Sequence, residues 1–252
     1  MLPLEGITVV SLEQAVAAPF ASRQLADLGA RVIKIERPGV GDFARDYDRS
    51  VKGQSAYFVW LNRSKESLTL DVKHPRAGEI LARLVGDADV FIQNLAPGAA
   101  SRLGLGADTL LARLPRLIAC DISGYGDAGP YAHKKAYDLL VQSEAGVLST
   151  TGTAEAACKV GISITDIGTG LHAYAAILGA LYQREKTGTG TRIEVTMFEA
   201  MAEWMSHPLY YAHFGGGAPQ RSGPDHATIV PYGKFSASDG ASVMLGIQNE
   251  RE

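Results

Sequence analysis

The order in which short apolar segments and helix-like segments alternate is the feature that most limits how this chain can fold. Residues 7–12 form a short apolar run that suits a buried strand, and residues 19–28 carry apolar side chains at helical spacing. Gly29 follows as a helix stop, and residues 31–36 alternate as a second strand. A strand, a helix and a second strand in this order predict two parallel strands joined by a helical crossover.

The same alternation continues as far as residue 196. Further strands are predicted at 67–71, 88–94, 116–123 and 191–196, and further helices at 76–85, 107–114, 137–147, 166–186 and 197–214. An irregular segment rich in glycine and proline at 215–240 precedes a last strand at 242–247. This order predicts an α/β fold, with an open, mostly parallel, nucleotide-binding-like sheet, flanking helices and the start of a second, smaller domain. We place the large domain at residues 1–196, and the linker helix and the beginning of the small domain at residues 197–252.

Composition and charge argue against several classes of partner. The chain has 24 basic and 27 acidic residues and no long basic run, so we do not expect nucleic acid as a partner. No stretch of about 18 uncharged apolar residues occurs, and the first residues are not typical of a signal peptide. Cys120 and Cys158 fit no disulfide framework and no metal spacing. These features favour a cytoplasmic protein with two reduced thiols and no contact with a membrane.

The motifs of several common enzyme classes do not occur in the sequence. The turn after the first predicted strand, residues 12–19, contains no G-x-G-x-x-G, which argues against NAD or FAD. No H-E-x-x-H is present, and the histidines show no metal-type spacing. Neither Ser123 nor Ser143 lies in a G-x-S-x-G turn, so a serine hydrolase is not expected.

Basic side chains follow the ends of several predicted strands. Arg37 follows the second strand, Lys73 the third and Arg102 the fourth, and Lys135 lies in the loop after the fifth. Ligands of open parallel sheets bind beyond the carboxyl ends of the strands, and arginine side chains there suit phosphate groups. Each of these residues alone is equally consistent with a solvated loop. Together they predict a site for a polyanionic nucleotide.

Asp166 stands where the long helix is predicted to begin. As an N-cap it would accept backbone N–H bonds, and the helix dipole would favour its ionised form. The same forces would hold a carboxylate ready as a nucleophile, although a plain helix cap is the alternative interpretation. Gly168 and Gly170 follow in the first turn, where glycine costs up to about 1 kcal/mol relative to alanine. Close approach of a ligand would explain these two glycines.

Several ordered segments resemble one known family. PLEGITVV, LADLGARVIKIERPGVGD, LNRSKESLTLDVKHPRAG, ISGYGDAGPYAHKKAYDLLVQSEAG and GISITDIGTGLHA are similar, in this order, to segments of the family III CoA-transferases. This is the formyl-CoA transferase/carnitine CoA-transferase family. Residues 47–65 look more like the branch that acts on small dicarboxylates such as mesaconate, citramalate or itaconate. Val16 stands where formyl-CoA transferase has an active-site glutamine, which argues against formate or oxalate as substrates.

The resemblance implies a catalytic residue and a set of CoA contacts. Asp166 matches the family's nucleophilic aspartate. The implied CoA-binding residues are Val16, Ala17, Arg37, Leu70, Lys73, Asn94, Leu95, Ala96, Arg102, Lys135, Tyr137 and Asp138. Coenzyme A and acyl-CoA enter as substrates, so no permanently bound cofactor and no metal are expected.

The resemblance also implies a reaction. CoA would pass from an acyl-CoA such as succinyl-CoA to a small carboxylic acid, favoured to be a dicarboxylate, through an aspartyl mixed anhydride and an aspartyl-CoA thioester. Backbone N–H groups of residues 166–170 would stabilise the oxyanion, and the glycines at 215–217 are a candidate lid. One alternative is an isomerase like the α-methylacyl-CoA racemases, which use a histidine where this chain has Tyr137. The other is an inactive CoA-binding fragment.

Family members are longer than this chain, and their subunits interlock as homodimers. The resemblance therefore implies a chain truncated relative to the family, and it implies a second copy of the chain as a partner.

Overall fold

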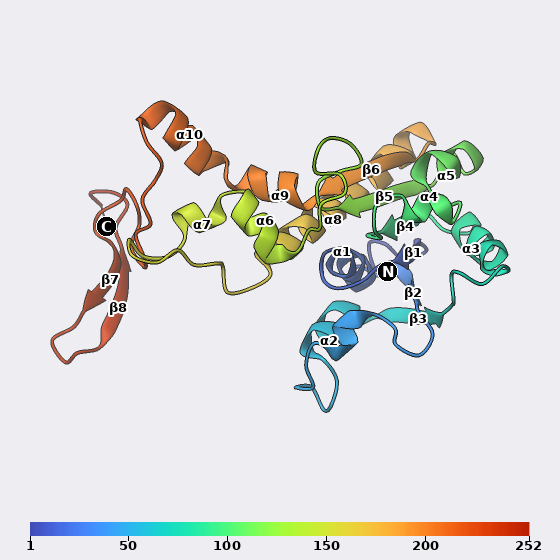
Figure 1. The fold of residues 1–252 in the computed structure, drawn as a ribbon, viewed down its shortest axis with the longest axis horizontal. Coiled ribbons are helices and arrows are strands. Elements are labelled where there is room, and N and C mark those ends of the chain that lie inside the picture. The colour runs from blue at the N-terminus through green and yellow to red at the C-terminus, as the bar shows by residue number, and fades with distance from the viewer. Residues whose placement is uncertain (252) are drawn as a thin grey trace.

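Six parallel strands form the centre of the protein, in the order β3-β2-β1-β4-β5-β6 (Figure 1). The computed structural model describes residues 1–251. The strands are β1 (Thr8–Leu12), β2 (Arg31–Glu36), β3 (Lys65–Thr69), β4 (Val90–Gln93), β5 (Ile118–Ser123) and β6 (Thr191–Thr196). Val10 of β1 pairs with Ile33 of β2 on one side and with Phe91 of β4 on the other. The predicted α/β fold is confirmed, and the strand order changes direction between β1 and β4, where such sheets bind ligands.

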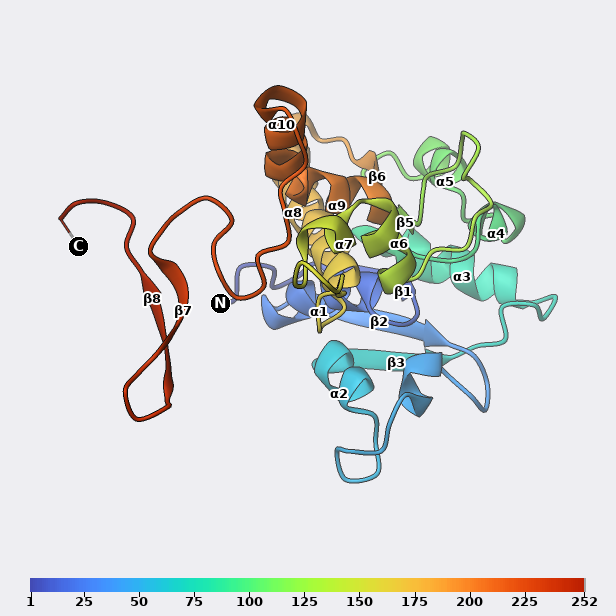
Figure 2. The same ribbon diagram turned by 60° about the vertical axis from the view of Figure 1, so that its left-hand side comes forward.

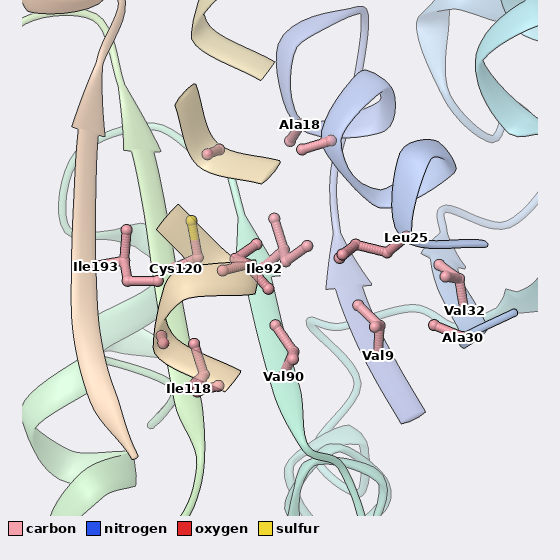
Figure 3. Packing of buried hydrophobic residues seen from close by; sticks show 14 of the residues in the cluster. Val9, Ala18, Leu25, Ala30, Val32, Val90, Ile92, Ile118, Cys120 and Ile193 are labelled. Atoms are coloured by element: carbon pink, nitrogen blue, oxygen red, sulfur yellow. The ribbon is translucent and has the colours of Figure 1, made fainter. Parts of the chain in front are cut away.

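Helices cover both faces of this sheet. Helices α1 (Ala17–Asp27) and α8 (Ile164–Thr187) lie on one face, and α3 (Ala77–Gly86), α4 (Ala99–Arg102) and α5 (Ala107–Arg113) lie on the other. Val9 faces α1 and α8, whereas its neighbour Val10 faces α3 and α5. Figure 3 shows Val9, Ile92 and Cys120 gathered against α1 and α8. Burial on both faces explains why the central strands β1 and β4 are mainly apolar.

Two glycines of α8 lie close to neighbouring helices. A Cβ atom on Gly170 would lie 2.7 Å from the carbonyl oxygen of Ala17 and 3.0 Å from Phe20 in α1. A Cβ atom on Gly168 would lie 3.2 Å from the ring of Trp204 in α9 (Met197–Trp204). Close packing of α8 against α1 therefore explains Gly170, and a side chain at residue 168 would be tight against Trp204.

The region after β6 differs from its prediction in two ways. The helix predicted at 197–214 is divided into α9 and α10 (Ser206–Gly215), because Pro208 has no N–H with which to continue the α9 hydrogen bonds. The segment predicted as irregular contains β7 (Tyr232–Ser236), which pairs antiparallel with β8 (Ser242–Gly246). This hairpin is largely exposed and lies apart from the α/β body in both views (Figures 1 and 2).

A helical insertion between β2 and β3 was not predicted. It consists of the 3-10 helix η1 (Phe43–Asp46) and the helix α2 (Ala56–Asn62). Ser55 caps α2 by accepting a hydrogen bond from the N–H of Phe58, and Leu61 is buried. The insertion packs against α1, so it extends the protein beside the first loop of the sheet.

Three further observations concern the described chain as a whole. None of its helices, over residues 1–251, has the length and apolar character needed to cross a membrane. The same residues include no group of three or more His, Cys, Asp or Glu placed to hold a metal ion. Cys120 is buried, Cys158 is exposed, and both are free thiols.

Substitution of two glycines on α8 tests the tight contact between α1 and α8. Gly170→Ala should lower the free energy of unfolding by about 2 kcal/mol, because the added methyl group collides with Ala17 and Phe20. Gly179→Ala is the matched control, since its added methyl group would meet no atom within 4 Å. It should raise stability by up to about 1 kcal/mol through helix propensity. Urea denaturation measures both values, and equal effects of the two substitutions would contradict the packing described here.

Candidate active site

Asp166 is the third residue of α8, and it is not the N-cap that the sequence suggested. The helix begins at Ile164 with Ser163 as its N-cap, and the Ser163 side chain makes no capping bond. The carboxylate of Asp138 takes that role: its Oδ1 accepts hydrogen bonds from the N–H groups of Thr165 (2.8 Å) and Asp166 (3.4 Å). A carboxylate from another helix therefore holds the turn that carries Asp166.

Asp138 is itself held in place from its other oxygen. It begins helix α6 (Asp138–Glu144), and its Oδ2 accepts a hydrogen bond of 2.6 Å from Nε2 of the buried Gln142. The Oε1 atom of Gln142 in turn accepts the N–H of Val160 in the loop that leads to α8. Both oxygens of Asp138 are thus occupied, which fixes its negative charge beside Asp166.

The charge of Asp166 is destabilised, contrary to the expected effect of the helix dipole. Burial, and after it the neighbouring charge of Asp138, raise the pKa of Asp166 to about 7. Within residues 1–251, no hydrogen-bond donor reaches the Asp166 carboxylate to offset these effects. Both protonation states are therefore populated near neutral pH, and the ionised form is more basic than an ordinary aspartate.

Three tyrosines stand near the first turn of α8. The hydroxyl of Tyr57 lies 3.4 Å from Oγ of Ser163. The ring of Tyr47 packs edge-on against the ring of Tyr57, with the two ring centroids 5.6 Å apart. Burial and the charges of Asp42 and Asp166 raise the pKa of Tyr47 to about 12, so its phenol stays protonated. Tyr137, the exposed N-cap residue of α6, also contributes to the raised pKa of Tyr47. Tyr47 and Tyr57 were not predicted, because no sequence spacing connects residues 47 and 57 with residue 166.

Side-chain hydrogen bonds hold the loop between β1 and α1 at two consecutive residues. Asn94, at the end of β4, accepts the N–H of Gln14 and donates to its carbonyl oxygen, both at 2.9 Å. The N–H of Ala15 donates to Oδ1 of Asp42 at 3.0 Å. Ala15 has a φ of 64°, a left-handed conformation that is unfavourable by on the order of 1 kcal/mol for a residue with a Cβ atom. These hydrogen bonds lie near the point between β1 and β4 where the strand order reverses.

Val16 and Ala17, the first two implied CoA contacts, have buried side chains. Val16 packs with Phe20, Leu61 and Ile167, and Ala17 begins α1. The Asn94 side chain is likewise engaged with the loop. A contact of Val16 or Ala17 with a ligand would therefore be made through backbone atoms.

Several other predicted residues surround two adjoining hollows at the carboxyl ends of the strands. The larger, of about 490 Å³, is lined by Leu95, Ala96 and Arg102 among other residues of the β4–β6 side. The smaller, of about 100 Å³, is mainly apolar and includes Arg37, Leu70 and Leu95. Leu95 borders both hollows, so they are neighbours. Lys73 and Lys135 line neither of them.

The four predicted phosphate-binding cations share one arrangement. Arg37, Lys73, Arg102 and Lys135 follow β2, β3, β4 and β5 respectively, so they lie beyond the same edge of the sheet. All four are exposed, and in the part of the chain that the structure describes none forms an ion pair with a carboxylate. Lys134, next to Lys135, is instead paired with Glu144 and lies 4.2 Å from the centre of the Tyr131 ring.

Negative charge also gathers along the larger hollow, around Arg192 of β6. Arg192 of β6 lies within 4 Å of four carboxylates, those of Asp108, Asp121, Asp127 and Glu194. One arginine does not balance four carboxylates, so the surroundings of Arg192 repel anions. Phosphate groups would therefore favour the side of the strand edge that carries Arg37, Lys73 and Arg102.

An open parallel sheet with helices on both faces defines an α/β protein. The chain belongs to CoA-transferase family III, because the family model with that description matches residues 4–252. This finding confirms the resemblance seen in the sequence.

Individual relatives agree with that assignment. The chain is 37% identical to a mouse succinyl-CoA:glutarate CoA-transferase over all of this chain and 58% of the relative. It is 40% identical to an acetyl-CoA:oxalate CoA-transferase of Acetobacter aceti, over 94% of this chain and 61% of the relative. A crystal structure of a CAIB/BAIF family protein from Brucella suis superimposes with a TM-score of 0.88 at 37% identity, over 95% of this chain and 65% of that one. The chain thus spans about three fifths of the length of these curated relatives.

The raised pKa of Asp166 predicts how one substitution changes with pH. Because the folded-state pKa lies above the ordinary value, the native state binds more protons than the unfolded state between about pH 4 and pH 7, and the wild type loses stability over that range. Asp166→Asn removes this loss. Its stability relative to the wild type should therefore increase from pH 4 to pH 8 by on the order of 1 kcal/mol after solvent screening.

Chemical denaturation at several pH values measures this difference. Asp87→Asn, at an exposed residue after α3, is the control and should show no such change. A difference between Asp166→Asn and the wild type that is constant from pH 4 to pH 8 would contradict the raised pKa.

Proposed function

We propose that this protein is a CoA-transferase that moves CoA from an acyl-CoA, such as succinyl-CoA, to a small dicarboxylic acid, with Asp166 as the covalent nucleophile. The observation that carries the proposal is the setting of Asp166. Its backbone is fixed by Asp138, while burial and the Asp138 charge raise the pKa of its unbonded carboxylate to about 7. Such a group is placed to attack an electrophilic carbonyl. Membership of CoA-transferase family III supports this chemistry.

The names of two relatives support a dicarboxylate as the acceptor. One is named for glutarate and one for oxalate, and both of these acids carry two carboxyl groups. Their named donors are succinyl-CoA and acetyl-CoA. In this chain the buried Val16 side chain presents no polar group, so the second carboxylate of the acceptor would be bound by other residues.

The distribution of apolar and basic groups suggests how CoA would lie. The smaller hollow, with Leu70, Val72 and Leu95 among its apolar walls, suits the flat adenine ring. Arg37 and Lys73 stand near it as partners for phosphates, and Arg102 extends the basic side into the larger hollow. The acidic group around Arg192 would keep the phosphates on this side. Binding energy from the nucleotide would then hold CoA while the acyl group changes.

The reaction is proposed to proceed through two covalent states of Asp166. Its carboxylate oxygen attacks the thioester carbonyl of the donor, the C–S bond breaks, and a mixed anhydride and CoA thiolate result. The thiolate attacks the aspartyl carbonyl, which releases the donor acid and leaves an aspartyl-CoA thioester. The acceptor carboxylate attacks this thioester and expels CoA thiolate, forming a second anhydride. The thiolate then attacks the acceptor carbonyl, which gives the product thioester and restores Asp166.

Stabilisation of the oxyanion requires a revision of the sequence-based proposal. The N–H of Asp166 donates to Asp138 and the N–H of Ile167 donates to the carbonyl of Ser163, so these two groups are occupied. The phenols of Tyr47 and Tyr57, which lie near this turn, are better candidates for the donors.

Four expectations from the sequence remain predictions. These are the homodimer, the cytoplasmic location, the domain boundary after residue 196 and the lid at residues 215–217. Gly215 ends α10 and Gly216 is its left-handed C-cap, so these two glycines already terminate a helix. No observation favours the isomerase alternative, and Tyr137 occupies the position at which the racemases use histidine.

Removal of the Asp166 carboxylate tests the proposed mechanism. Asp166→Ala should lower the rate of transfer at least ~1000-fold, because covalent catalysis is lost, while the Kd for CoA stays within about twofold. In the wild type, kcat/KM should rise with pH up to about 7 as the carboxylate ionises. Incubation with succinyl-CoA and a panel of free acids, followed by chromatography of new CoA esters, measures the rates. Transfer by Asp166→Ala at the wild-type rate would contradict the mechanism.

The basic strand edge is tested by CoA affinity. Arg37→Gln and Arg102→Gln should each weaken CoA binding about tenfold, because each removes a charged contact with a phosphate. Arg113→Gln is the matched control: it is also exposed, but it lines neither hollow. Isothermal titration calorimetry with CoA distinguishes the cases. Equal affinities of all three variants would place the phosphates elsewhere.

A further inference from the structure

Four charged side chains are buried together between the β1–α1 loop and the helical insertion. Glu13, Lys34 and Asp42 are each no more than 2% exposed, and so is the side chain of Lys65. The Lys65 ammonium lies 2.7 Å from Oε1 of Glu13, and the Lys34 ammonium lies 2.6 Å from Oδ2 of Asp42. Asn62 accepts a hydrogen bond from each lysine, at 2.8 Å from Lys34 and 3.2 Å from Lys65. The two cations and two carboxylates balance, as burial of charge requires.

Asp42 connects this group of buried charges to the β1–α1 loop. While Oδ2 is paired with Lys34, Oδ1 accepts the N–H of Ala15 at 3.0 Å and the N–H of Ala44 at 2.9 Å. A charged acceptor binds a backbone N–H more strongly than a neutral one. Lys34 balances the charge that Asp42 needs for this contact.

Ala15 has a backbone conformation that its neighbours must maintain. Its φ of 64° is unfavourable for alanine, and such conformations persist only where the surroundings impose them. Asn94 fixes the preceding residue, Gln14, through two hydrogen bonds. Two side chains from different loops, Asn94 after β4 and Asp42 before η1, thus determine the path of two consecutive residues. Strain of this kind is concentrated at functional sites.

The loop also lies against the turn that carries Asp166. Ala15 and Val16 pack in one apolar cluster with Tyr57 and with Ile167, the residue that follows Asp166. The charges of Asp42 and Asp166 both act on the phenol of Tyr47, which places Tyr47 near both carboxylates. A change in the loop would therefore change the surroundings of Asp166 directly.

We infer that Asp42, with Lys34 as its buried partner, is a positioning residue for the transfer reaction. It holds Ala15 in the left-handed conformation and so keeps the β1–α1 loop in place beside Asp166. The inference rests on the proposed function, since it assigns Asp42 to the same site. Asp42 does not touch the reacting atoms in this account, but it lines the smaller hollow, so the decisive comparison is between the kcat values of matched variants.

A matched pair of double variants isolates the hydrogen bond to Ala15. Lys34→Met/Asp42→Ala removes both charges and the acceptor, whereas Lys34→Met/Asp42→Asn removes both charges but keeps an oxygen that can accept the Ala15 N–H. The alanine pair should lower kcat at least ~10-fold relative to the parent protein. The asparagine pair should recover at least ~5-fold of that loss. Equal kcat values for the two pairs would overturn the inference.

A second pair of variants leaves the buried charges untouched, so it remains decisive if the double variants do not fold. Ala15→Pro removes both the N–H donor and the positive φ, whereas Ala15→Gly keeps both. The kcat of Ala15→Gly should exceed that of Ala15→Pro at least ~10-fold. Similar kcat values for the two variants would overturn the inference.

The parent protein separates a failure of this inference from a failure of the proposed function. If the parent transfers CoA but the matched variants have equal kcat, only the positioning role of Asp42 is overturned. If the parent transfers no CoA from any donor tested, the proposed function is overturned and this inference with it.

Discussion

The hydrogen bonds from the first turn of α8 to the Asp138 carboxylate are the interaction on which the candidate site depends. They satisfy the N–H groups of Thr165 and Asp166, which have no partner within the helix. They also place a fixed negative charge beside the Asp166 side chain. One contact therefore holds the Asp166 backbone and, together with burial, raises the pKa of its carboxylate. Asp166 is thereby placed and made more basic by the same neighbour.

The carboxylate of Asp42 holds the β1–α1 loop in a similar way. Asp42 holds the N–H of Ala15 as Asp138 holds that of Thr165, and each is fixed through its other oxygen by a buried side chain, Lys34 or Gln142. The two held segments come from distant parts of the chain and meet in the cluster that contains Val16 and Ile167. The parallel sheet makes this possible, because it brings the β1–α1 loop and the end of β4 to the point where the strand order reverses. Local polar contacts then determine the details of the site.

The sequence predicted the sheet well because parallel strands buried on both faces must be short and apolar. The segments that became β1, β4 and β5 show this pattern directly. It also placed Arg37, Lys73, Arg102 and Lys135 at one edge, since strand order along the chain is sufficient to do so. The division of the helix after β6 could have been predicted from Pro208. The strand β7 was missed because its sequence, YGKFS, has little of the β-branched character that marks a strand.

The site itself depended on contacts that no local pattern records. Asp166 was expected to cap its own helix, but the capping group comes from Asp138, 28 residues earlier in the chain. Lys34 lies in an alternating strand, where a lysine ordinarily faces water, and only the fold shows that it is buried against Asp42. Gly168 and Gly170 suggested a ligand, although the close approach of α1 already explains Gly170. In each case the residue type was informative, but its partner could be identified only in three dimensions.

The most direct test of the account follows an oxygen atom through Asp166. An acceptor acid labelled with ¹⁸O in both carboxylate oxygens is incubated with the protein and an unlabelled acyl-CoA, and the peptide that contains Asp166 is analysed by mass spectrometry. If Asp166 forms the two anhydrides, one ¹⁸O stays in the new thioester and the other passes to the Asp166 carboxylate. The account therefore predicts ¹⁸O in that peptide after turnover. Transfer of CoA that leaves the Asp166 peptide without ¹⁸O would contradict it.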